Sequence, residues 1–331
     1  MQIILLANKV GWGVQSLGRV IQDQLNNEGH SVQTLYFEDL LTHAGCAHLE
    51  DLRKLYSSDI LLGRENRVNQ FIRSINEIDQ TALDRLEQIL DQNKSAAIIS
   101  LIYTWSLALN MLPTACLAGR TIIDLRLDAK LDQNPRANLA TFNTTKVIFF
   151  DDAQNRLNWT LANDRYFALP YPMRERAVFI QGGGWNLLTA KDREWRLKHT
   201  SIWEISKSGP SGAFQSQETY AGPFTAPPPP IATTGIRSWP LIKHAKAMYT
   251  KPGGMSILEG ISFEPPLILT EPISMDEQNN LEFALAAGVA MTPAQLATCR
   301  DPHAEFAKIN QRMRQLNERA RPLRELCDQL H

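Results

Sequence analysis

The chain has 331 residues, of which 44% are hydrophobic, 8% aromatic and 21% charged, and its formal net charge is −1. This composition is that of an ordinary globular protein, and it excludes collagen-like, disordered and disulfide-scaffold classes. The 34 basic and 35 acidic residues leave no excess positive charge for a phosphate backbone or an anionic membrane, so we expect no nucleic-acid partner. The length predicts two domains.

The cysteines indicate a reducing compartment. Four are present, with no CxxC pair and no histidine at ligand spacing, so we predict neither a zinc site nor a disulfide framework, and we expect a cytoplasmic protein without a bound metal. Residues 95–119 carry no formal charge and are long enough to span a bilayer. Polar residues and Pro113 interrupt this stretch, which favours a buried strand running into a buried helix.

The first half of the chain alternates apolar runs of strand length with helical patterns. Such alternation predicts a parallel sheet covered on both faces. The expected strands are at 3–6, 31–36, 96–102, 121–125 and 146–150, and the expected helices at 17–25 and 81–91. A proline-marked connection at 169–172 closes this half, which we predict to be a domain over 1–171.

The second half repeats the pattern, which predicts another small open α/β sheet over 172–302. The expected strands are at 177–180, 202–205, 247–250 and 267–270, and the expected helices at 187–197, 255–263 and 280–287. Many glycines and prolines between 206 and 240 predict extended, irregular chain. Residues 303–331 read as one amphipathic helix bent at Pro322, which we expect to pack back towards the first domain.

The most informative stretch runs from Tyr249 to Gly260, where a strand feeds a Gly-Gly turn and a helix starts directly after it. The free amides and partial positive charge of a helix N-terminus suit a phosphate, and glycines let the backbone approach it. Ser256 adds a hydroxyl in the first turn, and Glu259 can accept two hydroxyl donors, such as the cis-diol of a ribose. The alternative is a plain tight turn with no ligand, since such turns are common in α/β domains.

The wider motif resembles the donor-site signature of GT-B glycosyltransferases, in particular the branch that holds monogalactosyldiacylglycerol synthase and the lipid II-forming N-acetylglucosaminyltransferase. The resemblance covers about 239–291, the donor half only. The residues that carry it are Lys251, Pro252, Gly253, Gly254, Ser256, Glu259, Pro272, Glu277, Gln278, Asn280 and Gly288.

The resemblance implies a nucleoside-diphosphate sugar as donor, most often a UDP-sugar, and two facing Rossmann-like domains with the donor bound by the C-terminal one. By that resemblance, the diphosphate would contact Gly253, Gly254 and Ser256. The ribose would contact Glu259, and the sugar hydroxyls would contact the two residues Glu277 and Gln278. Separately, the Gly182–Gly184 loop would approach the donor phosphates through Gly183, or it is a tight turn without a ligand.

The loop after the first strand departs from the family pattern. The family has a histidine near the reacting centre there, whereas this chain has Val14 after Gly13, and valine cannot take a proton. Asp124 is our candidate for the missing base, with other strand-end carboxylates as further candidates: Glu38, Asp39, Asp151 and Asp152. Any of these is more often a solvated loop carboxylate than a base.

The sequence therefore predicts a glycosyltransferase, and the resemblance implies that it moves a sugar from a UDP-sugar to an acceptor with inversion. We expect a soluble small-molecule acceptor, such as a natural-product aglycone, rather than a membrane lipid, because no basic–aromatic docking segment is present. Two alternatives stay open: a non-catalytic donor-binding partner subunit that lost its base at Val14, and a UDP-sugar epimerase.

Overall fold

A computed structural model of the chain describes residues 1–9, 12–58, 77–102, 104–129, 144–151, 153–162, 168–174, 178–181, 202–207, 214–217 and 239–330. The chain divides into two compact units. The first contains Met1–Arg126, Leu131–Ile148 and Arg324–His331, and the second contains Leu127–Lys130 and Phe149–Leu323. The second unit thus includes residues before 171 and most of 303–331, while the roles expected of the two domains stay predictions.

The first unit is built on a five-stranded parallel sheet, as the alternating pattern predicts. Its strand order is β2-β1-β3-β4-β5. The strands are β1 (Gln2–Ala7), β2 (Ser31–Tyr36), β3 (Ala97–Ser100), β4 (Ile122–Arg126) and β5 (Thr144–Ile148). The helices are α1 (Trp12–Asn27), α2 (His43–Ser58), α4 (Gln80–Gln92) and α5 (Thr104–Asn110), with short 3-10 turns η1 (Phe37–Leu40) and η2 (Thr114–Cys116).

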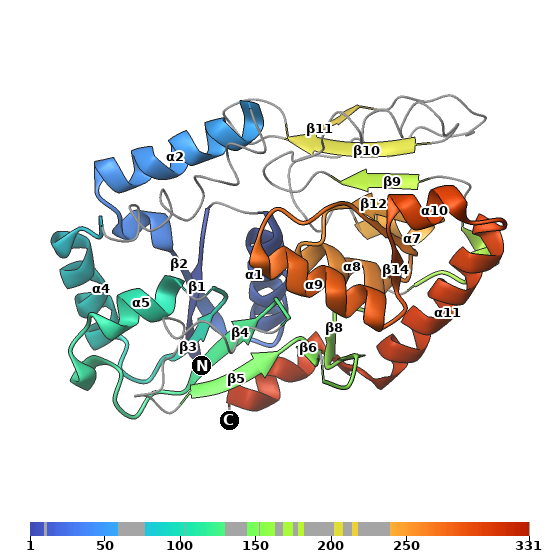
Figure 1. The fold of residues 1–331 in the computed structure, drawn as a ribbon. Coiled ribbons are helices and arrows are strands. Elements are labelled where there is room, and N and C mark those ends of the chain that lie inside the picture. Colours follow the sequence, from blue (N-terminus) through green and yellow to red (C-terminus); the bar gives the residue numbers. More distant parts are fainter. Residues whose placement is uncertain are drawn as a thin grey trace. The chain divides into compact units, whose positions relative to one another are not determined.

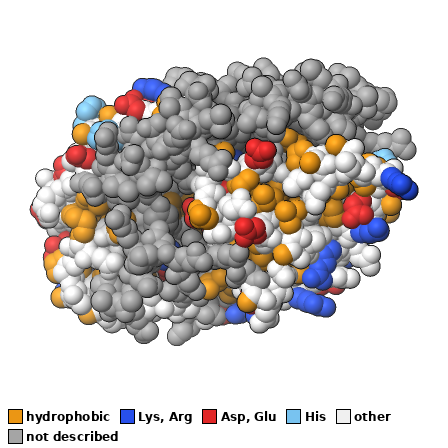
Figure 2. All heavy atoms as spheres, viewed as in Figure 1, with side chains coloured by type: hydrophobic (Ala, Val, Ile, Leu, Met, Phe, Trp, Pro, Cys, Tyr) orange, Lys and Arg blue, Asp and Glu red, His pale blue; other side chains and the backbone are white. Residues whose placement is uncertain are grey.

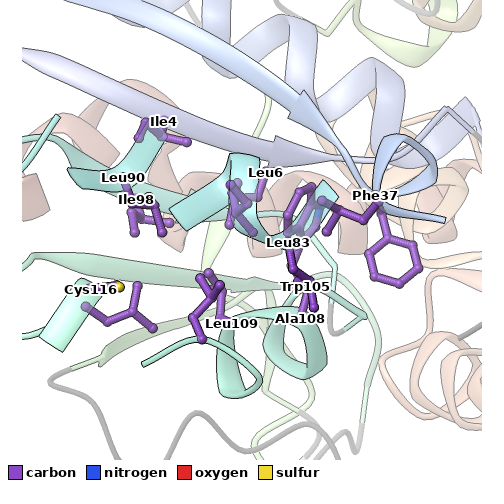
Figure 3. Close-up of a cluster of buried hydrophobic side chains, with 14 of the residues drawn as sticks. Ile4, Leu6, Phe37, Leu83, Leu90, Ile98, Trp105, Ala108, Leu109 and Cys116 are labelled. Carbon is purple, nitrogen blue, oxygen red and sulfur yellow. The ribbon is translucent and has the colours of Figure 1, made fainter. Parts of the chain in front are cut away.

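Helices cover both faces of this sheet (Figure 1). Successive side chains of a strand point to opposite faces, so one strand serves two cores. Leu5 lies towards α1, where it is 3.9 Å from the position that a Cβ on Gly18 would take. Ile4 and Leu6 belong instead to the cluster made with α4 and α5, which includes Leu83 and Trp105 (Figure 3).

The second unit is built on a six-stranded sheet in the order β11-β10-β9-β12-β13-β14, parallel except for the β10–β11 pair. Its strands are β9 (Val178–Gln181), β10 (Ile202–Lys207), β11 (Phe214–Gln217), β12 (Ala247–Thr250), β13 (Leu267–Leu269) and β14 (Ala290–Met291). Its helices are α7 (Trp239–His244), α8 (Gly254–Phe263), α9 (Met275–Ala286), α10 (Pro293–Thr298) and α11 (Pro302–Arg319). Shorter elements of this unit are β6 (Phe150–Asp151), β7 (Arg156–Leu157), β8 (Trp159–Thr160), η5 (Tyr171–Met173) and β15 (Arg321–Pro322). The last turn, η7 (Leu323–Leu330), belongs to the first unit from Arg324 on.

Two expectations need correction. The helix expected at 280–287 begins earlier, at Met275, because Ser274 caps it by accepting a hydrogen bond from the Glu277 amide. The helix expected over 303–331 does not bend at Pro322 but ends at Arg319, and Pro322 pairs with β8 instead. Residues 95–119 form β3, α5 and η2, in agreement with the expected buried strand running into a helix, and no described helix is long and apolar enough to cross a bilayer. The helix expected at 187–197 lies outside the described residues.

Candidate functional site

The strand order of the second unit reverses between β9 and β12. From β9 the chain continues to β10 on one side, whereas β12 leads to β13 on the other. At such a point two loops diverge from neighbouring carboxyl ends, which is where open α/β sheets bind their ligands. The last residues of the two strands, Gln181 and Thr250, lie side by side. Gly183 lies outside the described residues.

The N-terminus of α8 is the candidate anion-binding feature at this point (Figure 1). Its N-cap, Gly253, has no side chain with which to cap the helix, whereas Ser274 caps α9 and Asp301 caps α11. The amides that open a helix have no partner within it. The amides of Gly254, Met255 and Ser256 therefore present the positive end of the helix dipole just beyond β12.

The two adjacent glycines of the turn serve different purposes. Gly253 has φ −73° and ψ 143°, a conformation that any residue adopts, and a Cβ there would meet only the Ser256 Oγ, at 3.9 Å. A Cβ on Gly254 would lie 2.3 Å from the carbonyl oxygen of Leu127 and 2.7 Å from Asp128 Oδ1. Close packing thus requires glycine at 254, while no described neighbour requires it at 253.

The segment that crowds Gly254, residues 127–129, is held by Asn280 of α9. The Asn280 Oδ1 accepts a hydrogen bond from the Ala129 amide (2.8 Å), and its Nδ2 donates one to Asp128 Oδ1 (2.8 Å). Asn280 is 1% exposed, so this two-point clamp is internal to the unit. Sequence reasoning included Asn280 in the family signature but gave it no role.

Glu259, the expected ribose ligand, lies in the second turn of α8 and is 2% exposed. Its Oε1 accepts a hydrogen bond from the Trp239 indole Nε1 (3.0 Å). Burial raises the pKa of this carboxyl to about 7, and the hydrogen bond from Trp239 opposes that shift in part. The carboxyl is therefore close to half-protonated at neutral pH, with one oxygen already engaged by α7.

Glu277 and Gln278, expected in a loop, lie instead in the first turn of α9. Glu277 is buried and forms an ion pair with Lys251, and it also accepts a hydrogen bond from the Ile273 amide (2.9 Å). The pair ties the turn before α8 to the start of α9. Gln278 is partly exposed and donates to Glu282, one turn further along α9 (2.9 Å).

The residues predicted in the first unit are arranged differently from expectation. Gly13 and Val14 lie in the first turn of α1, rather than in a loop, and are partly buried. Asp124 is fully buried on β4, where it forms an ion pair with Arg126. A buried carboxylate held by a cation is a poor proton acceptor, so this placement gives no support to Asp124 as the base.

Two features of the second unit escaped sequence reasoning. Trp239 lies twenty residues before its partner Glu259, and the 127–129 segment lies far from Asn280 in sequence, so no local pattern connects them. The only signal was the second glycine of the Gly-Gly turn, which indicates a close approach without saying by what. The sequence predicts that a ligand approaches both glycines, whereas the close neighbour at Gly254 is the protein's own backbone, at Leu127.

The described residues contain no group of three or more histidine, cysteine, aspartate or glutamate side chains placed to hold a metal ion. On the face shown in Figure 2, Lys and Arg side chains gather over α11 at the right, with acidic side chains among them. That pattern is a mixed charged surface of the kind that a net charge of −1 predicts.

Comparison with known proteins places the fold. The chain matches no protein-family model and no curated protein. Among solved structures it is similar to Acinetobacter baumannii MurG, with 13% identity, 99% of this chain and 97% of that chain covered, and a TM-score of 0.50. It is also similar to Arabidopsis thaliana UGT89C1 complexed with UDP-L-rhamnose (16% identity, 96% and 92% covered, TM-score 0.53).

A further match is the Streptomyces sp. SF2575 glycosyltransferase SsfS6 complexed with thymidine diphosphate, with 14% identity, 99% of both chains covered and a TM-score of 0.54. The three matches have nearly equal scores, so they single out no branch of these proteins. At such low identity they show the architecture alone. The chain has the GT-B fold, as the donor-site resemblance implies.

Proposed function

We propose that this protein is a glycosyltransferase that transfers a sugar from a nucleoside-diphosphate donor, a UDP-sugar, to a soluble small molecule. The observation that carries the proposal is the N-terminus of α8, which begins after an N-cap without a side chain and presents three amides at the reversal of strand order. The GT-B fold supports it, and two of the similar proteins were solved with UDP-L-rhamnose and thymidine diphosphate.

The donor diphosphate would lie at Gly253, Gly254 and Ser256, on the amides of Gly254, Met255 and Ser256, with the Ser256 hydroxyl and the loop around Gly183 beside it. The Gly253 amide already donates to the Lys251 carbonyl. The open space at Gly253 supports this placement. Neither the backbone conformation nor a described neighbour requires glycine at 253. We therefore propose that the absence of a side chain there leaves room for the phosphate. The leaving diphosphate gains negative charge during transfer, and the helix dipole would stabilise it without reorganisation.

Glu259 would accept the ribose hydroxyls, as the resemblance implies. Its Oε1 is already engaged by Trp239, so the other carboxylate oxygen is the one left for the diol. A carboxylate accepts two hydroxyl donors better than a protonated carboxyl does. Because burial raises this pKa to about 7, donor affinity should increase as the pH rises through 7.

The donor sugar would contact α9 at Glu277 and Gln278, an assignment that rests on the resemblance. Glu277 is committed to Lys251 and to the Ile273 amide, so its part would be to fix the first turn of α9 against the α8 turn. Gln278 is partly exposed, and the hydrogen bond that its side-chain amide donates to Glu282 is easily exchanged for one to a sugar hydroxyl.

A second candidate is a donor-binding protein without transferase activity. Val14 replaces the family histidine, and Asp124 is locked in a buried ion pair, which favours this candidate more than a UDP-sugar epimerase. That the acceptor is a soluble small molecule is an expectation from the sequence. A vesicle co-sedimentation assay tests it, because robust pelleting of the protein with the vesicles would indicate a lipid acceptor.

The test is incubation of the purified protein with a panel of UDP- and dTDP-sugars and aglycone acceptors, with product detection by mass spectrometry. Calorimetry of UDP binding by wild type, Ser256→Ala and the exposed control Thr298→Ala accompanies it. We expect transfer, and weaker UDP binding in Ser256→Ala only. Binding without transfer would support the second candidate, and undetectable binding of every nucleotide would refute both.

A further inference from the structure

The Asn280 clamp holds a carboxylate, that of Asp128, close to the N-terminus of α8. Asp128 Oδ1 lies 2.7 Å from the position of a Cβ on Gly254. Because a Cα–Cβ bond is about 1.5 Å long, that oxygen lies within about 4 Å of the Gly254 Cα. A carboxylate therefore sits beside the first residue of the helix whose amides are the proposed phosphate ligands.

This position is held from two sides. Asn280 Nδ2 fixes the carboxylate and Asn280 Oδ1 fixes the next amide, that of Ala129, both at 2.8 Å. Leu127 and Ala129 are buried, so the backbone on either side of Asp128 is anchored as well. The glycine at 254 is what allows the segment to come this close. The carboxylate is thus placed by the fold rather than by chance exposure.

A helix N-terminus attracts an anion, and a side-chain carboxylate meets that preference as a phosphate does. Two anions cannot occupy neighbouring positions there without repulsion, because their separation would be only a few ångströms. The charge of Asp128 therefore favours the α8 N-terminus while no donor is present, and it opposes the arrival of a diphosphate.

We propose that Asp128, clamped by Asn280, is the resident anion of the α8 N-terminus and sets a threshold for donor binding. To bind, the diphosphate must displace this carboxylate or bind strongly enough to overcome its repulsion. The hydrogen bonds of Asn280 determine how strongly the carboxylate is held in place. The proposal rests on the proposed function for the identity of the competing ligand, a nucleoside diphosphate. It assigns Asn280 a task that the family signature leaves without one.

The test compares wild type with Asp128→Asn, which keeps a carbonyl oxygen for Asn280 Nδ2 but removes the charge. UDP and inorganic pyrophosphate are titrated into each protein by calorimetry at one fixed salt concentration. The control is Asp23→Asn, the same change of charge at an exposed position of α1. We expect UDP to bind Asp128→Asn at least about tenfold more tightly than wild type, and Asp23→Asn to match wild type.

Asn280→Ala supplies a second variant, because it removes both hydrogen bonds and leaves the charge in place. It should also tighten UDP binding, and adding Asp128→Asn to it should tighten binding little further. Equal or weaker UDP binding by Asp128→Asn would overturn the resident-anion role and leave the donor site standing. Unchanged binding with lost transfer would do so as well, because it would assign Asp128 to proton transfer.

The remaining outcomes separate the two proposals. If pyrophosphate binds Asp128→Asn more tightly than wild type but UDP binds neither protein, the resident anion is supported and the nucleotide donor is refuted. If neither ligand binds any variant, both proposals are refuted, because no anion site exists for the carboxylate to occupy.

Discussion

The two glycines of the α8 turn allow a matched pair of substitutions that separates ligand space from packing space. Gly253→Ala and Gly254→Ala each add one methyl group to neighbouring residues. At 253 the new Cβ would meet only Ser256 Oγ, 3.9 Å away, whereas at 254 it would lie 2.3 Å from the Leu127 carbonyl oxygen. The pair therefore separates an expected loss of donor binding, at 253, from an expected loss of stability, at 254.

The magnitudes follow from these distances. Gly253 has backbone angles that alanine adopts without strain, which favours alanine by about 0.4–1 kcal/mol through the unfolded chain. Alanine is a poorer N-cap than glycine by a similar amount, about 1 kcal/mol, so Gly253→Ala should leave stability close to that of wild type. Overpacking at Gly254 should cost about 1–3 kcal/mol. The better helix propensity of alanine offsets up to about 1 kcal/mol of that cost. We expect a net destabilisation of about 1 kcal/mol or more for Gly254→Ala.

The assay is urea denaturation of both variants together with UDP calorimetry. Gly253→Ala should be about as stable as wild type, yet bind UDP at least about tenfold more weakly, because the methyl group occupies the phosphate position. Unchanged UDP affinity in Gly253→Ala would refute the reasoning, since the space at 253 would then have no connection with the donor.

Three further predictions concern buried charges. Glu259→Gln should flatten the stability profile: between pH 4.5 and about 7 the folded wild type keeps a proton that the unfolded chain has released, so wild-type stability should fall by up to about 3 kcal/mol as the pH rises. Urea denaturation across that range measures it, and a level wild-type profile would contradict the raised pKa. Lys251→Met leaves the buried Glu277 carboxylate without its cation and should cost about 3 kcal/mol in the unfolding free energy, with partial recovery on adding Glu277→Gln. Arg174→Met removes a buried guanidinium that donates to three backbone carbonyls, and calorimetric unfolding should show a loss of about 3 kcal/mol or more.

Local patterns predicted most of the fold. Strands such as β1 and β13 are apolar runs, and α1, α4 and α8 are where the spacing of apolar residues places them. The start of α9 follows from Ser274 and Glu277 at capping-box spacing, a local signal that the expected start at 280 overlooks. The end of α11 at Arg319 depends instead on pairing between β15 and β8, which no local pattern shows.

The site was predicted less completely, for a physical reason. The turn, the helix start and the carboxyl at Glu259 are encoded within a dozen residues, so spacing alone brings them together. The partners of those residues, Trp239 and the 127–129 segment, come from other parts of the chain, and only tertiary packing supplies them. Sequence reasoning therefore predicts groups that would bind the donor and misses what already contacts those groups.

The most direct test of the central claim is a crystal structure of the protein with UDP. The account predicts the diphosphate on the amides of Gly254, Met255 and Ser256, with its ribose hydroxyls on Glu259. A nucleotide bound elsewhere, with the α8 N-terminus empty, would contradict it.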